Sequence, residues 1–289
     1  MGGMADNDEK AREPRDSSSS RLLRPEPASP LASLANLVLS PPLAGASKDY
    51  QRFVVLGQQR CGTTMLVSAL NDHSGVMCRG EIFHARAFQD KGKLKKLVRD
   101  VMPITYIRTV AYYSYSDVMH AVGFKLMADQ LLYFRNGVLI KYLLSNDAIQ
   151  LIHIWRQNTL HRYLSGIIAR RVGGYKSLRE PVRPNKIRLD PKNCEADFSR
   201  AQQHKEFLEQ TFAGPRLLTI AYEQLVEDRR TAYSKIQQHI GVQIEAIRPK
   251  TKKQRIWSAQ ELISNYGELA SYFAGTRWEH CFAEVPTVD

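Results

Sequence analysis

The stretch Arg52-Phe-Val-Val-Leu-Gly-Gln-Gln-Arg-Cys-Gly-Thr-Thr-Met65 decides the fold that we predict for this chain. Its apolar run Phe53–Leu56 predicts a buried strand, and Thr63–Leu70 predicts the helix that follows. The loop between them begins at Gly57 and ends at Gly62. Because the backbone N–H groups of such a loop and of the first helical turn have no internal partners, they can converge on an anion. The stretch therefore predicts a phosphate-binding strand–loop–helix unit.

The loop lacks the lysine that ATP-binding P-loops carry after their second glycine. Thr63 stands in that place, Thr64 adds a second hydroxyl, and the basic residue is Arg60, inside the loop. A small-molecule kinase with a degenerate P-loop is one alternative, but it would need that lysine and a strand-end Asp for Mg²⁺. The corresponding strand ends instead at Trp155-Arg156. A helix that merely begins after a strand is the other alternative. The pattern favours an anion other than a magnesium-bound triphosphate.

Segments that resemble strands alternate with segments that resemble helices over residues 49–289. Further strands are predicted over Ala121–Met127, Ala148–Trp155 and Arg216–Ala221, and helices over Asn158–Arg171, Glu195–Phe212 and Arg230–Ile240. This alternation predicts one P-loop-like α/β domain with a central parallel sheet flanked by helices. Residues 1–48, rich in Ser, Pro and charged side chains, are predicted to be a disordered N-terminal extension. Residues 173–194 are predicted to form a long basic loop.

The net charge of +12 lies outside the N-terminal extension. The first fifty residues hold six basic and seven acidic side chains, so the excess belongs to residues 51–289. Basic residues gather between Arg156 and Lys192 and again between Arg248 and Arg255. Such a field favours an anionic ligand, whether nucleotide, nucleic acid, anionic lipid or acidic glycan. A non-catalytic nucleic-acid-binding module rests on this charge alone, and we expect no nucleic-acid partner.

Cysteine usage and hydropathy bound the class of protein. The four cysteines are far apart and form no Cys-x-x-Cys pair, so neither a metal site nor a disulfide framework is predicted. Reduced thiols in a cytoplasmic enzyme are expected. Cys61, inside the loop, is expected to be a small packing residue, with a thiol of lowered pKa as the alternative. No run approaches the roughly 18 apolar residues of a membrane span, so no span is predicted.

The loop resembles the 5′-phosphosulfate loop of sulfotransferases, usually Pro-[Arg/Lys]-Ser-Gly-Thr-Thr followed by a large residue. The matching residues are Arg60, Gly62, Thr63 and Thr64, whereas Gln59 and Cys61 replace the usual Pro and Ser. The resemblance is closest to bacterial carbohydrate sulfotransferases of the trehalose and nodulation types. It implies that the donor is 3′-phosphoadenosine 5′-phosphosulfate (PAPS), used without a metal ion. It also implies that the donor is bound by Arg60, Cys61, Gly62, Thr63 and Thr64.

Two further segments extend the resemblance. Residues Ile154–Ser165 are similar to the strand end and helix that hold the 3′-phosphate of PAPS in sulfotransferases. Arg156 and Ser165 are assigned to that phosphate, although aligning the helix puts Gln157 where many relatives have Arg. Arg162 is the substitute if Arg156 points away. Lys252 and Arg255 resemble a C-terminal cofactor loop, with an ordinary charged loop as the alternative. Tyr222–Leu225 resembles a Tyr-Glu-x-Leu element, for which we predict a structural role only.

Sulfuryl transfer needs a base for the acceptor hydroxyl. Glu81, in Arg79-Gly-Glu-Ile-Phe-His84, resembles the Gly-Glu-x-Phe element of the trehalose-type enzymes and is our predicted base. His84 is the competing base or a substrate-binding residue. Lys125 is predicted either to face the substrate or sulfate, or to be a surface lysine. Arg60 is predicted to stabilise the charge that develops on the leaving group.

The resemblance thus implies a PAPS-dependent sulfotransferase that acts by in-line attack of an acceptor hydroxyl. A glutamate base favours a carbohydrate or glycolipid acceptor. Tyrosylprotein sulfation is the alternative within the class, and the kinase is the alternative outside it. The sequence leaves the acceptor, the role of the N-terminal extension and any oligomeric state open.

Overall fold

The computed structural model of this chain describes residues 46–47, 49–84, 92–133, 137–171, 185–250 and 257–283. Its centre is a five-stranded sheet in the order β3-β5-β2-β6-β7, in which every neighbouring pair is parallel. The strands are β2 (Gln51–Gly57), β3 (Val76–Glu81), β5 (Ala121–Met127), β6 (Ile149–Trp155) and β7 (Leu217–Ala221). A short antiparallel pair, β1 (Ala46–Ser47) and β4 (Tyr115–Ser116), stands apart from this sheet. The predicted α/β fold with a central parallel sheet is confirmed, and most of the predicted N-terminal extension lies outside the described residues.

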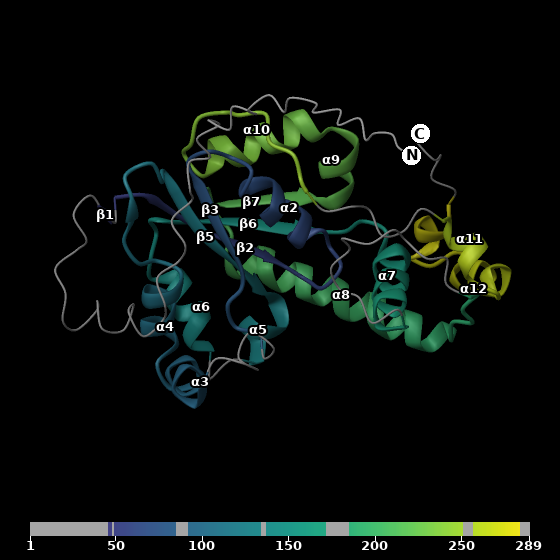
Figure 1. Cartoon of the computed structure of the whole chain (residues 1–289). Coiled ribbons are helices and arrows are strands. Elements are labelled where there is room, and N and C mark those ends of the chain that lie inside the picture. Colours follow the sequence, from purple (N-terminus) through teal and green to yellow (C-terminus); the bar gives the residue numbers. More distant parts are fainter. Residues whose placement is uncertain are drawn as a thin grey trace, which may run out of the picture.

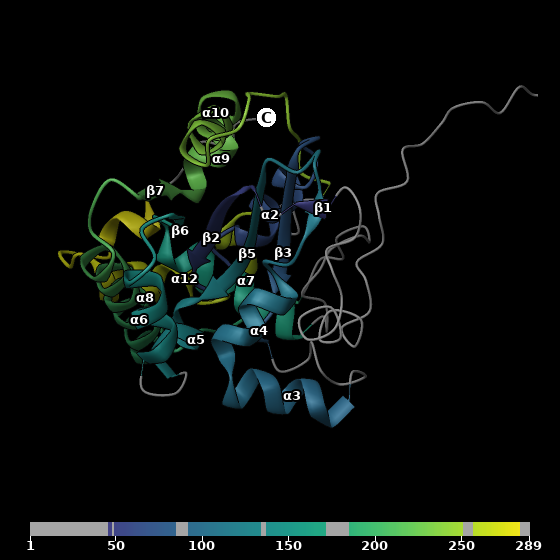
Figure 2. The ribbon, with the colours of Figure 1, turned by 90° about the vertical axis from the view of Figure 1, so that its left-hand side faces the viewer.

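Helices cover both faces of the sheet (Figures 1 and 2). One face packs against α2 (Thr63–Leu70), α9 (Tyr222–Glu227) and α10 (Arg229–His239). The other packs against α4 (Pro103–Val110), α5 (Ala128–Tyr133), α6 (Val138–Leu144) and α8 (Pro191–Thr211), and α3 (Gly92–Val101) lies against α4. A third group packs with the start of α8: α7 (Thr159–Arg171), α11 (Ala259–Leu262), α12 (Tyr266–Phe273) and the 3₁₀ helix η3 (Glu279–Phe282).

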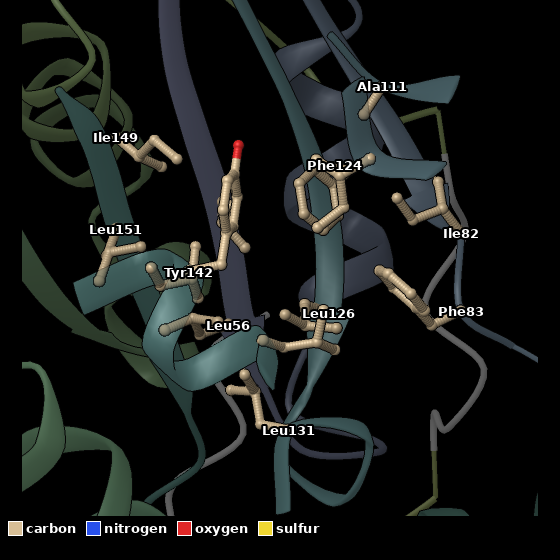
Figure 3. Close-up of a cluster of buried hydrophobic side chains, with 14 of the residues drawn as sticks. Leu56, Ile82, Phe83, Ala111, Phe124, Leu126, Leu131, Tyr142, Ile149 and Leu151 are labelled. Atoms are coloured by element: carbon tan, nitrogen blue, oxygen red, sulfur yellow. The ribbon is translucent and has the colours of Figure 1, made fainter. Parts of the chain in front are cut away.

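Burial on both faces explains the apolar strands. All seven residues of β5 are buried, and so is the stretch from Phe53 to the end of β2. A strand covered on two sides carries a continuous apolar run rather than an alternating one. Figure 3 shows Leu56, Phe124 and Leu126 pointing from β2 and β5 into one cluster with Leu131 from α5. This core fixes the strand ends from which the functional residues project.

The order of the strands places a crevice at the carboxyl ends of β2 and β6. From β2 the chain passes through α2 to β3 on one side of the sheet, and from β6 it passes through α7 and α8 to β7 on the other. Neighbouring strands whose connections leave in opposite directions open a crevice where α/β proteins bind ligands. The C-terminal segment closes one side of this region, because the Asn158 amide donates to the Cys281 carbonyl at 3.0 Å.

One predicted boundary is wrong. The sequence places the start of the helix before β7 at Glu195, but α8 begins at Pro191. Proline suits a first helical position because its missing N–H is not needed there. The Asp190 carboxylate caps the helix by accepting from the backbone N–H of Asn193 at 2.8 Å. The predicted loop 173–194 therefore ends earlier than expected; its described part is residues 185–190, and residues 172–184 lie outside the described set.

A histidine on β6 is fully enclosed beneath α8. His153 has no solvent exposure, and neither ring nitrogen has a hydrogen-bond partner within the described part of the chain. Burial, with a smaller contribution from Lys205, lowers the pKa of His153 to about 3. The Glu209 carboxylate lies 3.8 Å from Nδ1, but it is also held by Lys205 at 2.7 Å, which offsets its charge. His153 is therefore neutral in the folded protein.

This neutral histidine should make stability fall in mild acid. Between about pH 6.5 and 3 the unfolded chain binds a proton at His153 that the folded chain does not, so unfolding is favoured as the pH falls through that window. The loss is at most about 1.4 kcal/mol per pH unit. In urea unfolding at pH 7.5 and 5.0, His153→Leu should reduce the pH dependence of the free energy of unfolding by up to about 2 kcal/mol. The exposed His120→Gln is the control, and equal pH dependence in wild type and His153→Leu would contradict the expectation.

Candidate active site

The loop between β2 and α2 contains two residues with left-handed backbone. Arg60 has a φ of 69° and is the sole non-glycine residue with a positive φ among those described. Gly62 has a φ of 87°, and a Cβ there would lie 2.4 Å from the Tyr222 ring. Left-handed backbone at a non-glycine residue is strained and is common at ligand-binding turns. The loop is thus held in one tight conformation at the N-terminus of α2.

The underside of the loop is anchored to the body of the protein. The Gln58 amide donates to the Ala201 carbonyl of α8 at 2.6 Å. Cys61 is 1% exposed. Burial raises the pKa of the Cys61 thiol, against the opposite effects of Arg162 and Arg156. Cys61 is therefore a packing residue, and a thiol of lowered pKa, the alternative from sequence, is not what the structure has.

Three predicted site residues form a continuous chain of contacts beside the loop. The Lys125 ammonium lies 2.8 Å from a carboxylate oxygen of Glu81 and donates to the Thr64 hydroxyl at 3.2 Å. Glu81 pairs with Lys125 in the β3–β5 ladder, so both residues lie at the same carboxyl edge of the sheet. Lys125 is 6% exposed, which excludes the surface lysine considered from sequence. The acidic residue and the phosphate loop are joined by one buried cation.

His84 lies at the same edge. It follows Glu81 in the turn that ends β3, and its backbone N–H donates to the Glu81 carbonyl at 3.3 Å. The residue is half-buried. The structure thus brings the two carboxyl-edge candidates for the base, Glu81 and His84, into one turn.

The cation inside the loop reaches the helix after β6. The Arg60 guanidinium donates through Nε to the Ser165 hydroxyl of α7 at 3.0 Å. The two residues are 105 positions apart in the chain. The loop and α7, which the sequence assigns to opposite ends of one donor molecule, therefore meet directly.

Arg156 lies where β6 gives way to α7, and it stacks on a residue from another strand end. Its guanidinium carbon is 4.6 Å from the centre of the Tyr222 ring. Its Nε is buried, has no hydrogen-bond acceptor among the described residues, and lies 3.9 Å from the Glu223 carboxylate. Because the Tyr222 ring also touches Gly62, the tyrosine joins the phosphate loop to Arg156.

Glu223 holds the start of α7. Its carboxylate accepts from the backbone N–H groups of Gln157 at 3.1 Å and Asn158 at 3.4 Å. These N–H groups belong to the positive end of the helix, where a carboxylate is favourable. The structural role predicted for Tyr222–Leu225 thus includes holding Arg156 and α7 in place, a connection that sequence reasoning missed. The position of the motif directly after a strand was the available signal.

Arg162 is paired through one guanidinium nitrogen, although its buried Nε, like that of Arg156, has no hydrogen-bond partner among the described residues. Its guanidinium forms an ion pair with Asp197 of α8, and the same carboxylate accepts from Arg200 at 2.7 Å. The Arg162 side chain is 11% exposed. Of the two arginines proposed for a 3′-phosphate, Arg162 is held by a close carboxylate, whereas within the described part of the chain the carboxylate nearest to Arg156 is 3.9 Å away.

A pocket of about 230 Å³ lies at the carboxyl end of β6, between α7, α8 and the C-terminal turn. Its cationic lining residues are Arg156, Arg162, Lys205 and Arg277, and its aromatic ones are Trp155 and Trp278. Within the described part of the chain, none of its lining residues is a carboxylate. Gln58 and Cys61 contribute the wall on the loop side. The lining is suited to a ligand that is both anionic and partly planar.

Lys252 and Arg255 lie outside the described residues. The segment before them, residues 245–250, packs against α2 and the turn that follows it. The Ser74 backbone N–H donates to Glu245 at 2.9 Å, the Arg248 N–H donates to Asp72 at 3.1 Å, and the Lys250 N–H donates to Ser68 at 2.9 Å. As the segment advances from residue 245 to residue 250, the residues that it contacts go back from Ser74 to Ser68, so the two stretches run in opposite directions. Residues 245–250 therefore run along α2 toward its N-terminus, where the phosphate loop lies.

The chain has relatives over most of its length. No protein-family model matches it. A Nodulation protein H from Rhizobium tropici is 27% identical over 228 residues, which make up 77% of this chain and 89% of the relative. Another, from Rhizobium meliloti strain 1021, is 24% identical over 240 residues, 80% of this chain and 95% of the relative. Among solved structures, a sulfotransferase from Alicyclobacillus acidocaldarius is 15% identical with a TM-score of 0.48, covering 82% of this chain and 92% of that one.

The similarity to the two nodulation proteins thus extends over about four fifths of this chain rather than over one isolated motif. Its relatives include proteins of the nodulation type. Within the described ranges, no group of three or more His, Cys, Asp and Glu side chains is placed to hold a metal ion. In the same ranges, no helix combines the length and apolar character needed to cross a membrane.

The contact between Gly62 and Tyr222 should be intolerant of a side chain. Gly62→Ala would combine a left-handed backbone, at a cost of about 1–2 kcal/mol, with a methyl group forced against the ring. We expect the free energy of unfolding in urea to fall by about 2 kcal/mol or more. Gly267→Ala in α12, where a Cβ would meet nothing within 4 Å, is the matched control and should change it by less than about 1 kcal/mol. Equal effects of the two substitutions would show that the contact is not a constraint.

Proposed function

We propose that this protein is a sulfotransferase that transfers the sulfuryl group of PAPS to a hydroxyl of a carbohydrate or glycolipid acceptor, with Glu81 as the base. The observation that carries the proposal is the contact chain from Glu81 through Lys125 to Thr64 at the mouth of a phosphate loop that lacks the P-loop lysine. The proposed base thereby contacts a buried cation, and that cation contacts Thr64 in the first turn of α2, directly after the loop.

This arrangement orients the donor. Glu81 and Lys125 lie on the β3–β5 side of the loop, whereas the pocket with four cationic and two tryptophan side chains lies on its β6 side. With the sulfuryl group toward Glu81, the nucleoside and the 3′-phosphate extend toward that pocket. Arg156 lines the pocket, and its buried Nε has no hydrogen-bond acceptor among the described residues, which suits a phosphate oxygen. Arg156 with Ser165 is therefore our proposal for the 3′-phosphate.

The residues divide the chemistry between them. PAPS, when bound, supplies an activated sulfuryl group. Glu81 accepts the proton of the acceptor hydroxyl while the hydroxyl oxygen attacks sulfur in line. The bond between sulfur and the oxygen that it shares with the 5′-phosphate breaks, and adenosine 3′,5′-bisphosphate leaves. Arg60 and Lys125 stabilise the negative charge that develops on that oxygen and on the transferring group. Thr63, Thr64 and the N–H groups of the loop hold the 5′-phosphate.

The donor can be tested without knowing the acceptor. In calorimetric titrations with EDTA present, adenosine 3′,5′-bisphosphate should bind with a micromolar Kd and far more tightly than ATP does with Mg²⁺. A loop with Thr63 in place of lysine and a set of cations on its β6 side fits two separate phosphates better than a triphosphate. Tighter binding of ATP with Mg²⁺ would favour the kinase instead.

The same titration separates the two arginines. Arg156→Met should weaken adenosine 3′,5′-bisphosphate by about tenfold or more and adenosine 5′-monophosphate little, because a charge-assisted hydrogen bond contributes roughly 1.5–3 kcal/mol. Arg162→Met is the matched control. If Arg162→Met shows the larger selective loss, Arg162 and not Arg156 holds the 3′-phosphate.

The base is tested by a neutral isostere. Glu81→Gln should lower turnover with PAPS and a carbohydrate acceptor by about 10²- to 10⁴-fold, the usual contribution of a positioned base. The affinity for adenosine 3′,5′-bisphosphate should stay within about twofold. Glu227→Gln, at an exposed glutamate of α9, is the control. Equal losses of turnover and of nucleotide affinity in Glu81→Gln would reassign Glu81 to the scaffold, and activity on tyrosyl peptides alone would replace the carbohydrate acceptor.

A further inference from the structure

Glu81 follows an irregularity in the strand that carries it. Among the described strands, β3 is an edge strand that pairs with β5 alone. Arg79 is opposite Phe124 and Glu81 is opposite Lys125, so Gly80 is an extra residue on β3. Such a bulge bends a strand and turns the following side chain to a new direction. Within the β3–β5 ladder, Glu81 is held only by the last residue pair, Glu81 with Lys125.

Hydrogen bonds on both sides of the bulge hold this end of β3. Before it, the Arg79 guanidinium donates to the Tyr115 hydroxyl at 3.1 Å and to the Tyr113 hydroxyl at 2.5 Å. After it, the Ile82 carbonyl accepts from the Tyr106 hydroxyl at 3.2 Å. The segment Gly80–Glu81 is thus bracketed by side chains from outside the ladder.

The two tyrosines that receive Arg79 are themselves fixed. Their rings stack with centroids 4.3 Å apart, and the Arg79 guanidinium carbon lies 5.0 Å from the Tyr113 ring centre. The Tyr115 hydroxyl donates to the Ala111 carbonyl at 3.1 Å. The Tyr50 hydroxyl donates to the Tyr113 carbonyl at 2.7 Å. Arg79 therefore ties the strand to two side chains that are themselves held by stacking and hydrogen bonds.

Arg79 is not an ordinary ion-pair residue. Within the described ranges, no carboxylate oxygen lies within 4.0 Å of its guanidinium. Its hydrogen bonds go instead to the hydroxyl groups of Tyr113 and Tyr115. A half-buried permanent cation held in this way costs desolvation without a compensating ion pair. Its planar fork can, however, bind two acceptors in a fixed geometry, which a lysine cannot.

We propose that Arg79 is a positioning residue for Glu81: its fork on Tyr113 and Tyr115 sets the end of β3 so that the bulge at Gly80 delivers the carboxylate to Lys125, the cation that also contacts Thr64. The inference rests on the proposed function, in which Glu81 is the base. Because a displacement of about 1 Å at a reacting group can cost on the order of 10²-fold in rate, loosening this fork should lower turnover. It should leave donor binding unchanged, because Arg79 touches neither the phosphate loop nor the pocket.

A double-mutant cycle tests this assignment. Arg79→Met should lower kcat by about tenfold to a hundredfold, with the KM for PAPS and the Kd for adenosine 3′,5′-bisphosphate within about twofold of wild type. In the Glu81→Gln background the same substitution should lower kcat by less than about twofold, since the group it positions has been lost. Arg79→Lys should resemble Arg79→Met, because the charge without the fork does not position the strand.

Two further variants keep the test decisive. Tyr113→Phe with Tyr115→Phe removes the two phenolic acceptors, together with the hydrogen bond from Tyr115 to the Ala111 carbonyl, and should lower kcat in the same way, even if Arg79→Met does not fold. Arg52→Met removes another arginine that lies over a tyrosine ring, 5.7 Å from the Tyr112 centre, and should leave kcat unchanged. An equal loss of kcat in both backgrounds, full activity of Arg79→Lys, or weakened nucleotide binding would overturn the assignment. If Glu81→Gln keeps full turnover, the proposed base fails, and the positioning role fails with it.

Discussion

The close packing of the Tyr222 ring against Gly62 is the contact on which the site depends. The ring comes from the end of β7 and leaves no room for a side chain in the left-handed turn of the loop. The Arg156 guanidinium stacks on the same ring. Glu223, the residue after Tyr222, fixes the start of α7 by accepting from its backbone N–H groups. With α7 in place, Ser165 receives Arg60. One aromatic contact therefore couples the loop after β2 to the ends of β6 and β7.

Charge is divided unequally across this centre. On the β3–β5 side a single buried cation, Lys125, is shared between a carboxylate and a hydroxyl. On the β6 side four cationic side chains line one pocket, and their carboxylate partners lie outside its lining. A ligand with a terminal group to be transferred and a second phosphate elsewhere gains most when its second phosphate lies on the β6 side. The positive charge of the chain thus favours anionic ligands in general and is also concentrated in the pocket on the β6 side.

Features that follow from a contiguous segment could be predicted from the sequence. The phosphate loop, the parallel sheet and the strand ends at Lys125 and Arg156 all follow from apolar runs and glycines in order along the chain. The pairing of Glu81 with Lys125 could not be predicted, because it depends on a one-residue bulge that changes the register of β3. The partner of Arg162 was hidden for another reason. Asp197 lies on α8, and no pattern in the sequence indicates which face of that helix meets α7.

The two departures from the usual phosphosulfate loop have different physical meanings. Gln59 is exposed and its replacement of proline touches only the outer surface of the turn. Cys61 is buried against the pocket that Arg156 and Arg162 line, where a serine hydroxyl would need a hydrogen-bond partner and a thiol does not. The cysteine removes one possible donor to the 5′-phosphate and seals the underside of the loop. If the loop holds the 5′-phosphate as proposed, recognition of that phosphate rests on the backbone N–H groups, the two threonines and Arg60. The left-handed turns at Arg60 and Gly62 then matter more in this chain than the identity of residue 61.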